Sequence, residues 1–391
     1  MPAPAERLSR LPAYLFAVIG DRLRDMQAEG IDVIRLDIGS PDAPPPAAVV
    51  DKLYDAARNP SNHGYSGYRG LGRFREAVAR YYLRRFNVTL DPGSEVLPLI
   101  GSKEGIANLC LAYCDKGDAA LIPNIGYPSY MQGARLAGAD IVWVPADEET
   151  DYLMDFEQVS PSDRQRSKIA WVNYPNNPTG ATAELDFYTR AVEFCAGNDV
   201  LLASDNPYCE VTYDGYNAPS VMQVEGAKDI SLEFVSLSKS HNMAGWRIGA
   251  AVGSKKLIDT LLKVKSNIDS GHFNAIYEAA AFALDNTPQS WIDARNETYR
   301  LRRDKLMTVL PEVGLRAQNP KATLYVWATP DKLSARQYVQ EALEVAHVSL
   351  APGEGYGPGG VDWIRFSVGM TDDRFDEALS RLKAWYSSKY A

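Results

Sequence analysis

The sequence lacks the features that define several large classes of protein. No apolar run approaches the roughly 20 residues that span a bilayer, and the first residues contain no apolar core of a secretion signal. Cysteine is scarce, with four residues in 391, which is too few for a disulfide framework at this length. We therefore expect a cytoplasmic protein with reduced thiols.

Basic charge is also in deficit. The chain carries 41 Lys and Arg against 50 Asp and Glu, a formal net charge of −9. Nucleic acids and anionic membranes bind clustered basic surfaces, so we expect neither as the main partner. Hydrophobic residues make up 46% of the chain, a share typical of a globular protein with a buried core.

Two signatures of common active sites are missing as well. The motifs G-x-x-x-x-G-K-[ST] and H-E-x-x-H occur nowhere in the chain, and the four histidines show no metal-like spacing. The sequence therefore does not support P-loop nucleotide binding or a metal mechanism.

What is present in the middle of the chain is an alternation of short apolar runs and helix-like segments. Runs that are apolar throughout are typical of strands buried on both faces. Strands alternating with helices predict an α/β fold with a mainly parallel, doubly wound sheet. The runs are Val96–Ile100, Ala119–Pro123, Ile141–Val144, Ile169–Val172, Val200–Ala203, Phe234–Leu237 and Ile248–Val252. The helix-like segments include Ser102–Cys114, Tyr127–Leu136, Glu184–Ala196 and Lys256–Lys265.

The two ends of the chain predict a second, smaller unit. The segment Ala275–Leu310 has long helical spacing interrupted at Pro288. It is followed by strand-like and helix-like segments, and the N-terminal part contains one helix and the strand-like Val33–Ile38. We predict a large domain over residues 46–285 and a small α+β domain built from residues 1–45 plus 286–391. The segments after 310 are Leu324–Ala328, Ala335–Ala346, Trp363–Val368 and Arg374–Tyr386.

A lysine follows one of the buried runs in an unusual setting. Lys239 comes directly after Phe234–Leu237, is flanked by serines, and has Arg247 eight positions further on. A lysine at the edge of a buried sheet beside another cation has a lowered pKa and becomes a nucleophilic amine. The serines and the arginine suit a phosphate. Taken alone, Lys239 could equally be an exposed charge.

Three further runs end in polar segments. Residues 173–180, Asn-Tyr-Pro-Asn-Asn-Pro-Thr-Gly, predict a rigid turn at a strand end, where doubly wound folds bind ligands. Asp205 ends another run, and a carboxylate there is costly to bury without a partner. Residues 101–105 open a helix whose free N–H groups form an anion site, although they do not match G-x-G-x-x-G. A nucleophilic lysine, a buried aspartate, an asparagine turn and a phosphate cradle are together what pyridoxal phosphate requires.

In combination these segments resemble the class I and II aminotransferases of the pyridoxal-phosphate fold type I. The resemblance rests on Asn-Asn-Pro-Thr-Gly at 176–180, Asp205 with Tyr208, Ser-x-Ser-Lys at 236–239 with Arg247, and Arg365 within Trp-Ile-Arg-Phe-Ser. Their order and spacing fit the family along nearly the whole chain. The resemblance implies an enzyme of amino-acid metabolism or biosynthesis that moves an amino group from an amino acid to a 2-oxo acid by a ping-pong mechanism.

The resemblance also implies roles for the matching residues. Lys239 would form the Schiff base and act as the base for the proton shift, and Asp205 would pair with the pyridinium nitrogen. Asn177 and Tyr208 would hydrogen-bond the phenolate oxygen, and Tyr127 would stack on the ring. The phosphate would be held by Ser102, Lys103 through its backbone, Ser236, Ser238 and Arg247.

Substrate and subunit contacts follow from the same resemblance. Arg365 would clamp the substrate α-carboxylate, next to Asn177, and Gly39 lies where the N-terminal segment of the family closes over substrate. Tyr65 is similar to the tyrosine that reaches the phosphate of the neighbouring subunit, which implies a homodimer.

A narrower resemblance leaves the amino donor open. Four segments are similar to the LL-diaminopimelate aminotransferase branch, in which Tyr14 would touch substrate and 2-oxoglutarate would be the acceptor: Leu11–Phe16, Ile38–Asp42, Leu99–Gly105 and Asn267–Phe273. Residues 219–224 and 243–247 are equally similar to the glutamate–pyruvate (alanine) aminotransferases. Aspartate is a further alternative donor.

Other interpretations stay open at this point. Arg365 could form an ordinary salt bridge, Tyr127 could be a core aromatic, Ser102 could merely cap its helix, and Tyr65 and Tyr14 could serve packing. Ser-x-x-Lys and Ser-Asp-Asn also occur in serine acyl-transferring hydrolases, but there in the opposite order and with a Lys-Thr-Gly that this chain lacks. A non-catalytic, regulator-like use of the fold is a third possibility, although the sequence shows no helix-turn-helix segment.

Overall fold

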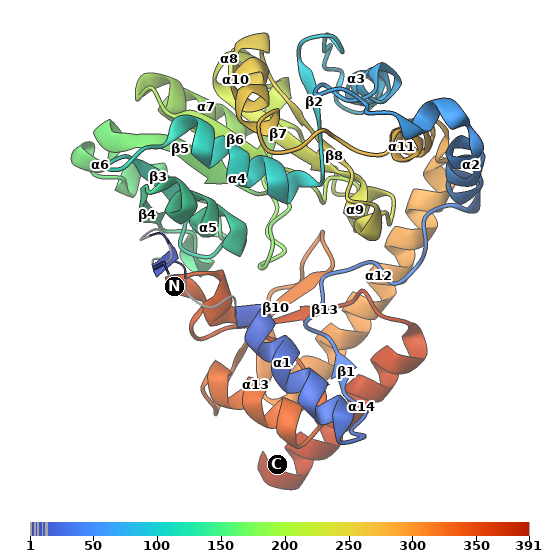
Figure 1. Ribbon diagram of the computed structural model, residues 1–391. Helices are drawn as coiled ribbons and strands as arrows, with labels where there is room; N and C mark the ends of the chain where they lie inside the picture. Colours follow the sequence, from blue (N-terminus) through green and yellow to red (C-terminus); the bar gives the residue numbers. More distant parts are fainter. Residues whose placement is uncertain (1, 4, 6–7, 10, 12–14, 391) are drawn as a thin grey trace.

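The computed structural model describes residues 2, 3, 5, 8, 9, 11 and 15–390 (Figure 1). Tyr14, predicted to touch substrate, lies outside the described residues. Figure 1 shows a larger body containing the middle of the chain and a smaller body containing segments from both ends, with helix α12 running from one to the other. The predicted boundaries at residues 45 and 285 remain a proposal; residue 45 lies between β1 and α2, and Asn286 ends α11.

A seven-stranded sheet forms the centre of the larger body, in the order β2-β8-β7-β6-β5-β3-β4. The four neighbouring pairs from β7 to β4 are parallel, and β8 runs antiparallel to both β7 and β2. The mainly parallel sheet predicted from the apolar runs is therefore confirmed. The strands are β2 (Val96–Leu99), β3 (Ala119–Pro123), β4 (Asp140–Val144), β5 (Ser167–Val172), β6 (Leu201–Asp205), β7 (Ser231–Ser236) and β8 (Gly249–Val252).

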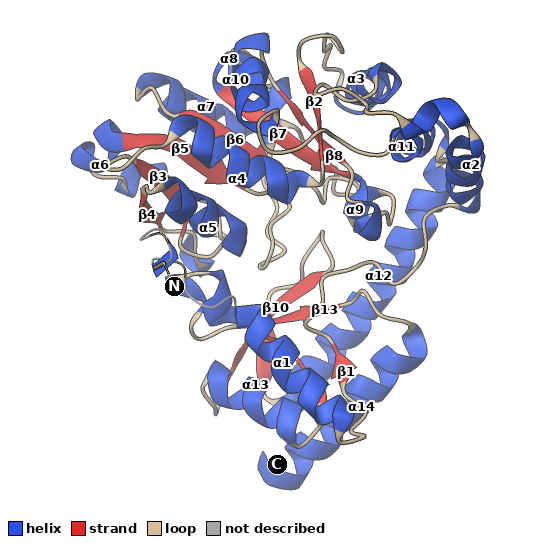
Figure 2. Cartoon of the chain, in the orientation of Figure 1, coloured by secondary structure: helices blue, strands red, loops and turns tan. Residues whose placement is uncertain are grey.

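Helices cover both faces of this sheet, as Figure 2 shows by the strands enclosed among helices. Alternate residues of one strand belong to different cores: Leu202 of β6 packs in the cluster with α3, α7 and α11, and Ala203 in the cluster with α4, α5 and α10. Burial on both faces explains why the strands are apolar throughout. The helices are α2 (Ala47–Arg58), α3 (Gly72–Phe86), α4 (Ser102–Tyr113), α5 (Pro128–Ala137), α6 (Pro161–Arg166), α7 (Leu185–Gly197), α8 (Ala227–Ile230), α9 (Leu237–Ser240), α10 (Lys255–Lys265) and α11 (Asn274–Asn286).

The smaller body has its own sheet and core. An antiparallel sheet in the order β12-β13-β10-β9 packs with helices of the C-terminal part and with Ile34 and Leu36 around a separate hydrophobic cluster. Helix α1 contributes Leu23 and Met26 to a smaller cluster with Val33. The predicted interruption at Pro288 is confirmed, since Pro288 precedes the first residue of α12. The elements are α1 (Leu15–Ala28), α12 (Gln289–Val309), α13 (Ala335–Glu344), α14 (Asp372–Tyr390), β9 (Leu315–Ala317), β10 (Tyr325–Pro330), β12 (Ala351–Pro352) and β13 (Ile364–Ser367).

One predicted strand is much shorter in the structure. Val33–Ile38 is reduced to β1 (Ile34–Arg35), which pairs in parallel with β11 (Val348–Ser349). The backbone beyond Leu36 bonds elsewhere: the Asp37 carbonyl accepts from Arg365, and the Gly39 carbonyl accepts from Lys239. The strand therefore ends where its carbonyl groups become part of the cavity described below.

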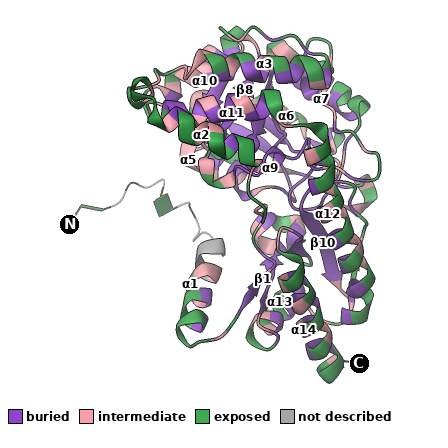
Figure 3. Cartoon of the chain, turned by 90° about the vertical axis from the view of Figure 1, so that its right-hand side faces the viewer, coloured by how far each residue is buried: buried purple, intermediate pink, exposed green. Residues whose placement is uncertain are grey.

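Buried residues concentrate on the strands, and exposed residues on the outer faces of the helices (Figure 3). Among the described residues, no helix is both long and apolar enough to cross a membrane. All four cysteines are buried and form no disulfide.

Candidate active site

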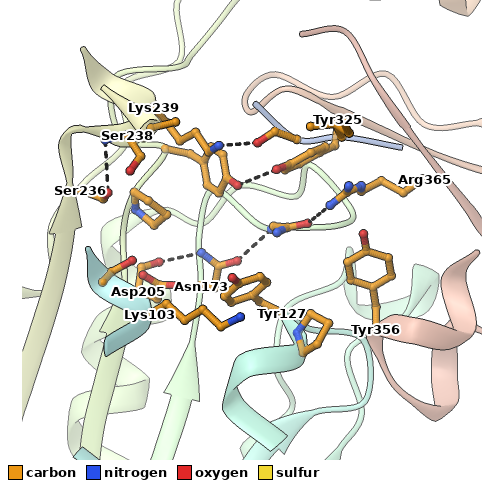
Figure 4. A pocket seen from close by; sticks show the side chains of 18 of the residues that line it. Lys103, Tyr127, Asn173, Asp205, Ser236, Ser238, Lys239, Tyr325, Tyr356 and Arg365 are labelled. Carbon is orange, nitrogen blue, oxygen red and sulfur yellow. Dashed lines mark hydrogen bonds between the residues drawn. The ribbon is translucent and has the colours of Figure 1, made fainter. Parts of the chain in front are cut away.

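A cavity of about 340 Å³ lies where the carboxyl ends of the large-sheet strands face the smaller body. It brings together most of the residues singled out in the sequence. Figure 4 shows side chains from the two bodies pointing into the same space, with Asp205 and Lys239 on one side and Tyr325 and Arg365 on the other. The predicted residues that line it are Gly39, Ser102, Lys103, Tyr127, Asn177, Asp205, Tyr208, Ser236, Ser238, Lys239, Arg247 and Arg365.

Lys239 enters the cavity from α9, which begins immediately after β7. The hydroxyl of Ser236 accepts a hydrogen bond from the backbone N–H of Ser238 (3.2 Å) and so caps this short helix. The Lys239 Nζ donates to the carbonyl of Gly39. Burial, with further contributions from Arg365 and Arg247, lowers the pKa of Lys239 to about 7. With this pKa, and with no ion pair to a carboxylate in the described part of the chain, about half of the amine is neutral near pH 7.

Asp205 ends strand β6 with a side chain that is almost fully buried. Its Oδ2 accepts from the hydroxyl of Tyr130 (2.8 Å), and its backbone carbonyl accepts from Asn173 Nδ2 (2.6 Å). Its Oδ1 has no hydrogen-bond partner among the described residues. Burial raises the pKa of Asp205 to about 7. A buried acceptor without a donor is costly, so this oxygen calls for a ligand that supplies one.

Residues that could hold an anion meet at the N-terminus of α4. Gly101 precedes the helix with a positive φ of 75° and provides no side-chain cap, so the alternative that Ser102 is the N-cap is wrong. A Cβ at Gly101 would overlap the guanidinium of Arg247. The glycine therefore lets Arg247 approach the first turn, where free N–H groups and the helix dipole favour an anion. Burial, together with Arg247, also lowers the pKa of Lys103.

Arg365 lies on β13, on the opposite side of the cavity. Its Nη1 donates to Asn177 Oδ1 (2.9 Å) and its Nη2 to the backbone carbonyl of Asp37 (2.5 Å). The guanidinium lies over the rings of Tyr325 (4.2 Å to the centroid) and Tyr356 (5.0 Å). Its Nε has no partner, and it forms no ion pair with a carboxylate of the described residues. The ordinary salt bridge considered from the sequence is therefore not what the structure contains.

The asparagine turn and two tyrosines complete the wall between the two bodies. Asn173 Oδ1 accepts from the backbone N–H of Asn177 (2.8 Å), and this holds the turn next to Asp205. The hydroxyls of Tyr208 and Tyr325 are hydrogen-bonded to each other (2.8 Å). Tyr127 is half-buried, packs edge-on against Tyr130 and lines the cavity, so it contacts both the core and the site.

Tyr65 is not brought into this cavity within one chain. Its side chain is 92% exposed, in the loop between the turn at residues 60–63 and α3. This leaves its predicted contact with a neighbouring subunit untested.

Several residues of the site were not singled out in the sequence. Tyr130 lies one helical turn after Tyr127, a spacing that could have indicated a shared face. Asn173 opens the asparagine turn but was given no role. Tyr325 and Tyr356 reach the cavity through strand pairing and packing of the smaller body, for which the sequence holds no local signal.

Comparisons with known proteins agree with this geometry. The family described as Aminotransferase class I and II matches residues 31–382, and its members use pyridoxal phosphate. An LL-diaminopimelate aminotransferase of Moorella thermoacetica is 43% identical over 97% of both chains, and one of Dehalococcoides mccartyi is 42% identical over 97% of both. The solved structure of BacF from Bacillus subtilis, without ligand, superimposes with a TM-score of 0.94 at 34% identity and covers 99% of each chain.

These matches extend over nearly the whole length of the chain, and the cavity contains the residues on which the resemblance rested. They do not support the serine hydrolase alternative, because the Ser-x-x-Lys of this chain lies at the end of β7 within an aminotransferase fold. The chain belongs to the class I and II aminotransferases and is a transaminase.

Proposed function

We propose that this aminotransferase uses pyridoxal phosphate and transfers the amino group of LL-diaminopimelate to 2-oxoglutarate. The observation that carries the cofactor assignment is the unsatisfied Oδ1 of Asp205 in the same cavity as Lys239. When bound, pyridoxal phosphate supplies a protonated ring that accepts the electrons released at the substrate Cα. A ring N–H directed at Asp205 would provide the donor that this oxygen lacks and would stabilise its ionised form.

The other residues suit the remaining parts of the cofactor. The N–H groups of the first turn of α4, the hydroxyls of Ser236 and Ser238, and Arg247 offer donors and positive charge to a phosphate. Asn177 and Tyr208 offer hydrogen bonds to an oxygen of the ring, and Tyr127 offers an aromatic face.

Lys239 and Arg365 divide the work on the substrate. The neutral form of the Lys239 Nζ would take the proton from the substrate Cα and deliver it to the aldehyde-derived carbon of the bound cofactor, which requires an amine whose pKa lies near the working pH. Arg365 binds the α-carboxylate, for which its planar guanidinium is suited and its unpartnered Nε is available. Asn177, already bonded to Arg365, holds that guanidinium in place.

The substrate assignment is supported by the relatives that are 42–43% identical along the chain and are named LL-diaminopimelate aminotransferases. A half-reaction panel tests it. The purified protein is mixed with single amino acids, and loss of the yellow absorbance of the bound cofactor is followed for LL-diaminopimelate, glutamate, alanine, aspartate and aromatic amino acids.

LL-diaminopimelate and glutamate should react fastest. A faster reaction with alanine or aspartate would overturn the donor assignment but leave the transaminase intact. A colourless protein would contradict the cofactor assignment. A yellow protein that no amino acid bleaches would contradict the transamination and favour a non-catalytic role.

We further propose a cytoplasmic homodimer in which Tyr65 completes the phosphate site of the partner. Its 92% exposed side chain supports this role, since an aromatic residue so exposed buries little within its own chain. A mixture of Tyr65→Ala and Lys239→Ala proteins tests it, because hybrid dimers would contain one intact site. Recovery of activity on mixing is expected. A fully active monomer by sedimentation would contradict the proposal.

A further inference from the structure

A third arginine lines the cavity besides Arg247 and Arg365, and it was not among the residues predicted from the sequence. Arg35, at the end of β1, contributes to the same wall as Gly39 and Arg365. Its side chain is 33% exposed, whereas Arg365 is almost fully buried. A molecule in the cavity can therefore reach Arg35.

The hydrogen bonds of Arg35 use only one edge of its guanidinium. Its Nε donates to Asp37 Oδ1 (3.1 Å) and its Nη2 to Asp37 Oδ2 (2.6 Å), while the Asp37 carboxylate itself is almost fully buried. The Nη1 of Arg35 has no partner among the described residues. A guanidinium carries five N–H donors in a rigid fork, so one edge stays available to a second acceptor.

The same chain shows an arginine that holds two carboxylates in this way. Arg300 grips Glu297 through Nε (2.8 Å) and Nη2 (2.7 Å) and simultaneously donates through Nη1 to Asp304 (2.6 Å). Arg35 binds one carboxylate through Nε and Nη2 in the same way, but its Nη1 meets no carboxylate of the described residues. The missing partner is the natural place for a carboxylate of a ligand.

Asp37 fixes two of the three arginines of the cavity, Arg35 and Arg365, relative to each other. Its side chain binds Arg35, and its backbone carbonyl binds Arg365 Nη2 (2.5 Å). The two guanidinium groups are thus held by different atoms of one residue, within about 10 Å of each other by bond geometry. Arg365 is assigned to the α-carboxylate of the substrate, so a carboxylate at the other end of a short chain would come within reach of Arg35.

We infer that Arg35 binds the distal carboxylate of dicarboxylic substrates and so sets the preference of this enzyme for dicarboxylic over monocarboxylic amino acids and 2-oxo acids. This inference rests on the proposed function, because it takes Arg365 as the α-carboxylate site. Asp37 orients Arg35 and offsets its charge. This lowers the free-energy cost of leaving the other edge of the guanidinium without a ligand between turnovers.

The test compares glutamate with alanine in the half-reaction of the holoenzyme. Arg35→Gln should lower the ratio of kcat/KM for glutamate over alanine by about 10- to 100-fold, the range expected for losing a charged hydrogen-bonded contact. It should also weaken inhibition by glutarate relative to butyrate by a similar factor. Arg35→Lys, which keeps the charge, should fall between wild type and Arg35→Gln. The matched control is Arg316→Gln, which removes an exposed arginine paired with Glu148 (3.0 Å) outside the cavity and should leave both ratios unchanged.

The outcomes separate this inference from the proposed function. If wild type reacts with glutamate and Arg35→Gln retains the wild-type ratio and glutarate inhibition, the role of Arg35 is wrong and the transaminase stands. A wild type that reacts only with monocarboxylic amino acids would also overturn the role of Arg35. If no amino acid reacts with wild type, the proposed function itself fails. Should Arg35→Gln not fold, Arg35→Lys and the glutarate measurement decide.

Discussion

Charged residues in the interior of the molecule are paired with protein groups, whereas charged residues in the cavity are incompletely paired. In the interior, Lys265 is paired with Asp269 (2.7 Å) and Glu104 (3.3 Å), and Arg303 with Asp214 and Asp304 (2.7 Å each). Glu233 accepts five hydrogen bonds from neighbours along the chain: Tyr82, Ser204, Asn206, Ser220 and the backbone of Val221. These charges have the partners that burial requires.

The cavity also contains a lysine, an acidic residue and an arginine, but each of these has a charge or a polar atom that no described protein group satisfies. Lys239 has no carboxylate, Asp205 has an oxygen without a donor, and Arg365 has an Nε without an acceptor, all judged over the described residues. Asp205 and Glu233 even lie on neighbouring strands. The protein can satisfy buried charges and does so elsewhere, so the unsatisfied groups are best understood as waiting for ligands.

The largest expected difference lies between Lys239, which is partly buried in the cavity, and Lys265, which is fully buried. Lys239→Ala should lower turnover by about 10⁴-fold, because it removes the group that moves the proton. Lys265→Ala should lower the free energy of unfolding by about 3–5 kcal/mol, because it leaves two carboxylates unpaired. Turnover per folded molecule and urea unfolding measure both effects. If folded Lys265→Ala protein is as inactive as Lys239→Ala protein, the distinction between a structural and a catalytic lysine is wrong.

The second prediction concerns the pH dependence of stability in protein prepared without pyridoxal phosphate. The folded-state pKa of Lys239 is about 7, against 10.5 ordinarily, so the unfolded chain binds the proton more tightly. The cost of burying this lysine is therefore full below pH 7 and disappears as pH rises toward 10.5. Lys239→Met should stabilise the protein by about 4 kcal/mol near pH 6 and by much less at pH 10. Urea unfolding at several pH values checks this; a gain that grows with pH would reverse the sign and refute the assignment.

The third prediction compares the two carboxylates. Asp205→Asn should lower kcat by about 10²- to 10³-fold, the usual effect of losing a preorganised electrostatic contact, with little change in the free energy of unfolding. Glu233→Gln should do the opposite: it should cost about 2 kcal/mol of stability through its hydrogen-bond network and leave kcat within a few-fold. Equal effects of the two substitutions on kcat would remove the distinction.

The smallest of these differences is expected for the arginines. Arg365→Lys should raise KM about 10- to 100-fold for every carboxylate substrate, since an ammonium cannot replace the planar fork. Arg303→Lys should leave KM unchanged and affect only stability. Initial-rate measurements with several substrates decide, and wild-type kinetics for Arg365→Lys would rule out the α-carboxylate role.

Much of the large body could be predicted because its sequence signals are local. The run Ala119–Pro123 coincides with β3, and the other runs fall within one to three residues of their strands. The asparagine turn, Lys239 and Asp205 each follow the end of an apolar run closely in the sequence. Parallel strands bring their carboxyl ends to one edge of the sheet, so these residues come together there.

The rest depends on contacts between distant segments, which no local pattern encodes. Val33–Ile38 is apolar enough for a long strand, yet its backbone is diverted to Arg365 and Lys239. Tyr325 and Arg35 reach the cavity only because the two chain ends fold together. Tyr65 acts, on the proposal above, in another molecule, which one chain cannot reveal.

The guanidinium of Arg365 has a consequence for the order of events during synthesis of the protein. Its two hydrogen bonds span 188 and 328 positions of the chain, and the second is among the longest separations between hydrogen-bonded residues described in the molecule. Contacts so distant form late in folding, because a large loop must close first. On the ribosome the strands of the large sheet emerge well before Arg365, so a nascent chain can build the lysine side of its site early. The enzyme becomes competent only when its last segment returns to Asp37, near the beginning of the chain.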